Sequence, residues 1–238
     1  MELTEQTVEI LKNFSTINPN LMFYEGDDQL PGSSLRTISE ANNCLVKCGV
    51  PEVFPRSFGI YDLNEFMGTL GLVDTPNLDF EENNLIIRDQ SGRSKIKYFY
   101  SDESNLTTPQ KDISMPEPEV KFTLDSDTLN RLRKASSTLG HNELSITGEK
   151  GILNLSVLEK ENNSSNTYTI DIDGEFDPDI DFNFVLNISE IKILTGDYDV
   201  GLSSRFIAQF DNKERETPYE LSYWIALNKN LSTFGGKK

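Results

Sequence analysis

A short strand-to-helix corner, Phe58 to Val73, constrains the fold of this chain more than any other stretch. Its FGIY start is typical of a strand end, and Asp62 followed by Glu65 forms the capping box of a helix. Apolar side chains then recur at i, i+3, i+4 and i+7, at Leu63, Phe66, Met67 and Leu70. One face of this helix is therefore apolar, and we expect it to pack on a sheet.

The corner occurs a second time in the chain. Residues 185–191 (VLNISEI) match residues 60–66 (IYDLNEF) in residue type at every position, and Asn187 replaces Asp62 as the helix cap. A second set matches at a similar offset: Val8, Leu11 and Lys12 correspond to Leu129, Leu132 and Arg133. Two matches at similar offsets predict a tandem repeat of one domain.

Both halves predict the same order of helix, strands, helix and strands. Helices are expected from Thr4 to Phe14 and after Asp125 or Asp127, with the two corners as the later helices. Strands are expected between Ile17 and Tyr61, and at 85–88, 96–100, 143–147, 152–158, 167–172, 197–202, 206–210 and 219–227. The tail from Lys229 is expected to fray. The fold class is α+β: two similar domains with helices on one face of antiparallel sheets.

A change of character separates the two halves. The stretch SDESNLTTPQKDISMPEPEV, residues 101–120, holds three prolines, several acids and little periodicity, which is typical of an extended linker. We place an N-terminal domain at 1–105, the linker at 106–120 and a C-terminal domain at 121–238. The alternative is a long surface loop within a single domain.

Charge and cysteine content restrict the functions that remain. A net charge of −17 normally argues against nucleic acid, but a partner meets only one face of a protein. Cys44 and Cys48 are the only cysteines, and we expect packing residues without a disulfide in a reduced, cytosolic setting. Neither a secretory signal nor a membrane-length apolar run is present, so no membrane association is expected.

Catalytic and metal-binding motifs are weak. His141 is the only histidine, and the sequence has no phosphate loop or nucleophile elbow, so we expect neither an enzyme nor a cofactor. The acids between Asp171 and Asp181 alternate with other residues and would line one side of an extended chain. Calcium is conceivable there, but Gly174 is misplaced for a helix–loop–helix calcium site, and Pro178 interrupts the run of acids. A solvated acidic edge that discourages strand pairing is the favoured interpretation.

A basic helix face is the more informative signal. Arg131, Arg133 and Lys134 cluster on one predicted helix, Lys12 takes the matching place in the first half, and Lys192 lies just inside the second predicted helix of the later half. Cations on helices can contact phosphates without reading bases. The alternative is a solvated helix face that is paired with nearby acids.

Three segments resemble the sliding clamps of T-even-type bacteriophages, which are processivity factors of the replicative DNA polymerase: LKNFSTIN, IYDLNEFMGTLGLV and FNFVLNISEIKILTGDYDV. The resemblance runs through most of the chain, with departures from Gln29 to Arg56 and in the GGKK ending. It implies the DNA clamp fold and a homotrimeric ring around duplex DNA, with helices lining the hole. By position, the DNA-facing candidates are Lys12, Arg131, Arg133, Lys134 and Lys192.

The resemblance also implies partners in the cytoplasm of the infected bacterial host. These are the phage DNA polymerase, a clamp loader and possible late-transcription proteins, which would insert peptide tails into an apolar pocket near the joint of the domains. The candidate pocket residues are Leu106, Ile113, Met115 and Leu227. The competing interpretation is an acidic β-rich structural or interaction module that binds proteins or calcium and never contacts DNA. A hydrolase would need a carboxylate pair that the pattern does not bring together.

Overall fold

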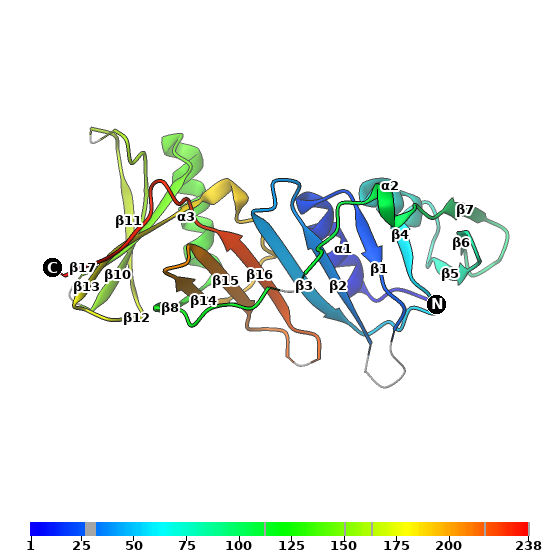
Figure 1. Ribbon diagram of the computed structural model, residues 1–238. Helices are drawn as coiled ribbons and strands as arrows, with labels where there is room; N and C mark the ends of the chain where they lie inside the picture. Colours follow the sequence, from blue (N-terminus) through cyan, green and yellow to red (C-terminus); the bar gives the residue numbers. More distant parts are fainter. Residues whose placement is uncertain (27–31, 112, 150, 163, 217, 238) are drawn as a thin grey trace. The chain divides into compact units, whose positions relative to one another are not determined.

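The chain forms two compact α+β units (Figure 1). The computed structural model describes residues 1–26, 32–111, 113–149, 151–162, 164–216 and 218–237. The first unit consists of Met1–Asp112 with Arg215–Leu221, and the second of Ile113–Glu214 with Ser222–Lys238. Two repeated units built from helices and antiparallel sheets confirm the predicted fold class. The predicted domain boundaries and the linker at 106–120 stay predictions.

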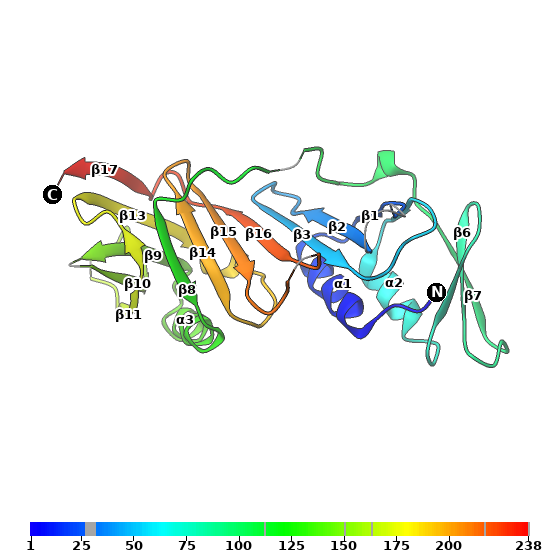
Figure 2. The same cartoon turned by 90° about the horizontal axis from the view of Figure 1, so that it is seen from below.

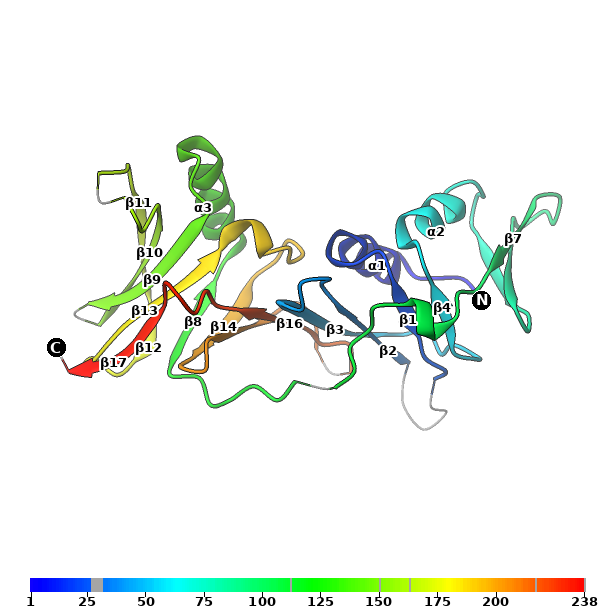
Figure 3. The same ribbon diagram turned by 45° about the horizontal axis from the view of Figure 1, so that its top comes forward.

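The first unit places two helices on one face of a sheet with strand order β3-β2-β1-β4 (Figure 3). A separate sheet has the order β5-β6-β7. The helices are α1 (Glu5–Ile17) and α2 (Leu63–Leu70), followed later by the 3-10 turn η1 (Glu103–Asn105). The strands are β1 (Leu21–Phe23), β2 (Ser33–Ile38), β3 (Cys44–Val50), β4 (Phe58–Ile60), β5 (Asn77–Phe80), β6 (Asn84–Arg88) and β7 (Lys95–Phe99).

Helix α1 begins where the sequence predicts and runs three residues further. The Thr4 side chain accepts a hydrogen bond from the Thr7 amide at 3.2 Å and caps the helix. A buried carboxylate, Glu52, accepts from the Thr4 amide and the Thr7 hydroxyl, both at 2.6 Å, and so satisfies further donors at the positive end of the helix. Asn13 is buried although it is polar and follows the exposed Lys12.

The corner at α2 forms as predicted. Asp62 accepts hydrogen bonds from the amides of Asn64 and Glu65, each at 3.0 Å. Of the four predicted apolar positions, Leu63, Phe66 and Leu70 are buried. Phe66 packs against aromatic rings from β1 and β7, which lie 6.4 and 5.3 Å away between ring centroids. The corner therefore joins α2 to the core of the first unit.

The second unit has two sheets, with strand orders β12-β8-β14-β15-β16 and β11-β10-β9-β13-β17 (Figure 2). Its helix is α3 (Ser126–Leu139), which contacts β10 and β11, and its 3-10 turn is η2 (Ile188–Glu190). The strands are β8 (Val120–Leu124), β9 (Glu143–Glu149), β10 (Ile152–Leu158), β11 (Tyr168–Asp173), β12 (Glu175–Phe176), β13 (Ile180–Asn187), β14 (Tyr198–Ser203), β15 (Ile207–Asn212), β16 (Leu221–Ala226) and β17 (Thr233–Lys237).

Helix α3 repeats the capping of α1. The Asp125 carboxylate accepts from the Thr128 amide at 2.6 Å, as the Thr4 hydroxyl accepts from the Thr7 amide at the start of α1. Gly140 ends the helix with a φ of 72°, in the left-handed region that glycine adopts most readily. Equivalent caps in equivalent places support the tandem repeat.

Two expectations about the second unit are wrong. The second corner is no helix but the three-residue turn η2, because Ile191 and Ile193 both bury their side chains and force the chain to extend. Lys192 therefore follows a turn and does not lie inside a helix. The tail does not fray from Lys229, because β17 pairs with β13, and the ring of Phe234 stacks on Phe184 at 5.8 Å.

Both cysteines are buried and free of disulfide, as expected. Burial raises the pKa of the Cys48 thiol to about 11, although Arg215 nearby acts in the opposite direction. The thiol therefore stays protonated and unreactive at neutral pH. No helix in the described part of the chain is long and apolar enough to cross a bilayer.

Candidate nucleic-acid interface

Helix α3 presents two cations to solvent. Its inner side buries Leu129 and Leu132, and Arg131 and Lys134 project from the opposite side as exposed residues. The Arg131 guanidinium donates to the Thr128 hydroxyl at 3.1 Å, which keeps its stem along the helix. These two side chains lie where the sequence predicts them.

Arg133 differs from its two neighbours. It is half-buried, and its Nη2 donates a hydrogen bond to the Ile191 carbonyl oxygen at 2.6 Å. Burial lowers the pKa of its guanidinium, against an opposing effect of Tyr198, but an arginine remains charged. The charged group of Arg133 thus contacts the protein's own backbone.

Lys192 is brought to α3 by that same contact. Its side chain is exposed between Ile191 and Ile193, which are 2% and 5% exposed. Because the Ile191 carbonyl oxygen accepts a hydrogen bond from Arg133, the segment 191–194, which carries Lys192, lies against α3 (Figure 3). The structure therefore brings four of the predicted cations together on the second unit.

The helices of the first unit carry a different charge. Lys12 is exposed on α1, as predicted, but Glu5 and Glu9 are exposed on the same helix. On α2 the exposed side chains include Asn64 and Glu65. The helix surface of the first unit is therefore acidic on balance, and the basic surface belongs to the second unit. The tandem repeat gave no sign of this asymmetry.

The four predicted partner-binding residues lie in different environments. Leu106 packs over β4, where a Cβ added at Gly59 would meet its Cδ1 at 2.6 Å. Leu227 is only 4% exposed, so it forms part of the core and cannot border an open groove as predicted. Ile113 is half-buried, and Met115 lines a cavity. The structure therefore places Met115 in a concave site.

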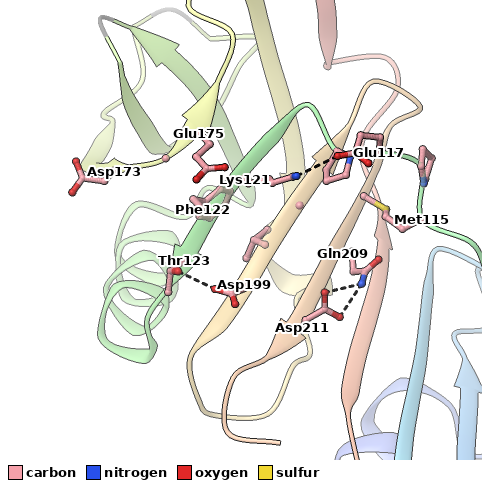
Figure 4. Close-up of a pocket in the computed structure, with 15 residues that line it drawn as sticks. Met115, Glu117, Lys121, Phe122, Thr123, Asp173, Glu175, Asp199, Gln209 and Asp211 are labelled. Carbon is pink, nitrogen blue, oxygen red and sulfur yellow. Dashed lines mark hydrogen bonds and ion pairs between the residues drawn. The ribbon is translucent and has the colours of Figure 1, made fainter. Parts of the chain in front are cut away.

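That cavity, of about 800 Å³, opens on the second unit (Figure 4). Met115, Pro116 and Pro118 form one wall, and its floor is the solvent-facing side of β8, β14 and β15. Besides Glu117, four acidic side chains from strands line the cavity: Asp173, Glu175, Asp199 and Asp211. Lys121 pairs with Glu117 at 3.3 Å. Alternation along β8 could have identified Lys121 and Thr123 as outward-facing, but nothing local links them to Gln209.

The acids of the stretch 171–181 are exposed to solvent, but they do not prevent strand pairing, since β12 pairs with β8, and β13 pairs with β9 and β17. Asp171, Asp173, Glu175 and Asp177 are all exposed and alternate with less exposed residues, as predicted. Throughout the described ranges, no three Asp, Glu, His or Cys side chains come close enough together to hold a metal ion. Calcium binding therefore has no structural support in that part of the chain.

The chain is similar in sequence to known phage proteins. A family model described as "gp45 sliding clamp, C terminal" matches residues 121–236. The sliding clamp of Vibrio phage KVP40 is 30% identical over 215 residues, which cover 88% of this chain and 94% of the relative. The sliding clamp of Enterobacteria phage T4 is 30% identical over 203 residues, covering 83% and 85%. That of Escherichia phage RB69 is 26% identical over 235 residues, covering 95% and 96%.

Solved structures with little sequence identity share the fold. Proliferating cellular nuclear antigen (PCNA) from Entamoeba histolytica superposes with a TM-score of 0.69 at 15% identity, covering 93% of this chain and 94% of that one. A. fulgidus PCNA, solved with the C-terminal region of FEN-1, gives 0.71 at 12% identity, covering 95% and 96%. With the phage relatives at 30% identity over most of their length, these comparisons show that the chain belongs to the sliding clamp family and is a DNA sliding clamp of the T4-like bacteriophage type.

Proposed function

We propose that three copies of this chain close into a ring around duplex DNA and tether the phage DNA polymerase during replication in the host cytoplasm. The observation that carries the proposal is the cationic surface of α3 and Lys192 on a chain of net charge −17. An acidic protein repels DNA from most of its surface, so one basic face favours a single path for the duplex. Phosphate contacts by lysine and arginine read no sequence, which suits a clamp that slides.

Two sheet edges offer the contacts for assembly. In the described part of the chain, β7 is paired on one side only, by β6, and β11 on one side only, by β10. On β7, Lys95, Lys97 and Phe99 are exposed, and the Lys97 ammonium lies 4.9 Å from the centroid of the Phe99 ring. On β11, Asp171 and Asp173 are exposed. The exposed faces of the two edges thus carry opposite charges.

The inward-facing residues of these edges also match. Ile96 and Tyr98 alternate with the cations of β7, and Ile170 and Ile172 alternate with the anions of β11. An antiparallel pair of β7 and β11 from different copies would place lysines beside aspartates on one face and apolar side chains together on the other. Because the two edges differ, the contact is heterologous, and repeated contacts generate a ring when the rotation closes.

A mass measurement tests this assembly. Three chains of 26.9 kDa give a particle of about 81 kDa. We expect light scattering at micromolar concentration to find that mass, with dissociation only on dilution. A monomer throughout the micromolar range would contradict a closed ring as the resting state.

Partners are proposed to dock in the cavity behind Met115. A clamp that reads no sequence needs a separate surface for its polymerase and its loader, and late-transcription proteins could share it. The floor contributed by Val200 and Gly201 and the wall of Met115 and Pro118 would accept an aromatic anchor of a partner tail. The acidic rim favours lysine or arginine beside that anchor.

Substitution of Met115 tests the docking site. Met115→Asp should weaken binding of a C-terminal polymerase peptide at least tenfold, because it places a charge on the apolar wall. Ile113→Asp is the matched control, since it makes the same change two residues away in a side chain that does not line the cavity. Calorimetry on both trimers measures the effect. Equal affinities for Met115→Asp and wild type would place the docking site elsewhere.

A further inference from the structure

The segment that carries Lys192 is held at both ends by side chains from three elements. At one end the Ile191 carbonyl oxygen accepts from Arg133 of α3 at 2.6 Å. At the other end the Leu194 amide donates to the Tyr223 hydroxyl of β16 at 3.2 Å, and the Leu194 carbonyl accepts from the Tyr198 hydroxyl of β14 at 2.9 Å. The backbone on either side of Lys192 is therefore fixed to the core of the second unit.

The two ends of this segment are not held equally. Tyr198 and Tyr223 are 0% exposed, so their positions follow from the packing of the core. Arg133 is half-buried on a helix, and η2 before the segment has only three residues. In a low-dielectric setting, a charged donor makes a stronger hydrogen bond than a neutral one. The hydrogen bond from Arg133 thus ties the segment to α3 itself.

We propose that Arg133 is a positioning residue, which fixes the Lys192 segment to α3 and makes Lys192 part of one cationic surface with Arg131 and Lys134. This inference rests on the proposed function, in which that surface faces duplex DNA. Arg133 then acts on DNA through Lys192 and makes no phosphate contact of its own. Its role differs from that of Arg131 and Lys134, although all three are cations on the same helix and the sequence does not distinguish them.

A double-mutant cycle separates the two roles of Arg133. Arg133→Met removes the hydrogen-bond donor and keeps a side chain of similar length. Lys192→Gln removes the cation of the segment that Arg133 positions. Each single variant should lower the salt slope of binding to a short linear duplex by about 0.9 per lost phosphate contact. Combining them should lower it no further. A fall in the double variant of about twice that size would mean that Arg133 contacts phosphate itself, which overturns the proposal.

Hydrogen exchange measures the positioning directly. In Arg133→Met, amides of residues 191–194 should exchange at least tenfold faster, and those of β9 and β10 should remain protected. An unchanged exchange rate of the amides in residues 191–194 would overturn the proposal that Arg133 positions this segment. If Arg133→Met does not fold, Arg133→Lys, which keeps the charge but offers a single point donor, provides the same comparison.

The Arg131→Gln variant distinguishes failure of this inference from failure of the proposed function. If Lys192→Gln leaves the salt slope unchanged and Arg131→Gln lowers it, Lys192 is outside the DNA surface and the positioning role is overturned, but the proposed function stands. If neither variant changes the slope, the second unit does not contact DNA through this surface and the proposed function fails with it.

Discussion

Reversing both exposed cations of α3 will nearly abolish the electrostatic attraction of this clamp for DNA. Arg131→Glu with Lys134→Glu replaces two cations by two anions in each subunit, on the unit that carries the basic surface. We expect affinity for duplex DNA to fall more than tenfold at moderate salt and the salt slope to decrease by about 1 for each phosphate contact that is lost. Anisotropy titrations of a labelled duplex at several salt concentrations measure both quantities.

The control for this change must alter net charge equally. Lys111→Glu with Lys229→Glu reverses two exposed lysines that lie outside α3 and the Lys192 segment. That variant should retain a near-normal salt slope. The α3 variant should also keep its stability, because neither side chain belongs to the buried side of the helix. Equal losses in both variants would show that only total charge matters and that α3 has no special role.

Charge reversal on one sheet edge will break the ring, and reversal on both edges will restore it. Asp171→Lys with Asp173→Lys places cations opposite Lys95 and Lys97 of the neighbouring copy. Like charges facing each other across paired strands are destabilising. We expect the particle mass to fall from about 81 kDa to that of a single chain, 26.9 kDa, as measured by light scattering.

The rescue variant makes this test specific. Adding Lys95→Asp and Lys97→Asp to the same chain restores opposite charges across the contact, so the mass should return to that of the trimer. The β7 pair of substitutions alone should dissociate the ring as the β11 pair does. A combined variant that remains monomeric would show that these edges do not face each other.

Local sequence patterns predict three of the four expected helices, and only the second corner differs. The caps at Thr4, Asp62 and Asp125 act over two or three residues, so they can be read without the rest of the chain. The strand at Ile152–Leu158 was predicted to the residue, because its alternation is regular and one face is buried. These features depend on neighbours in the sequence, which is why the prediction held.

Features that depend on distant residues were missed. Strand β17 exists because Phe234 packs on Phe184, a contact that its polar, glycine-containing surroundings did not indicate. The different roles of Arg133 and Lys134 depend on a carbonyl oxygen 58 residues away in the chain. The sequence places Leu227 beside a groove, but its side chain is buried. The cavity combines residues from Met115 to Asp211, and no short motif connects them.

Release from cut DNA tests most directly whether the protein encloses the duplex. The protein is first incubated with linear plasmid, the plasmid is then closed by ligation, and the sample is washed with high salt, which removes charge-mediated binding. Our account predicts that protein stays on the closed circle through the wash and leaves when a restriction enzyme cuts it. Protein that washes off the intact circle, or that remains on the cut DNA, would contradict a ring that holds DNA by enclosing it.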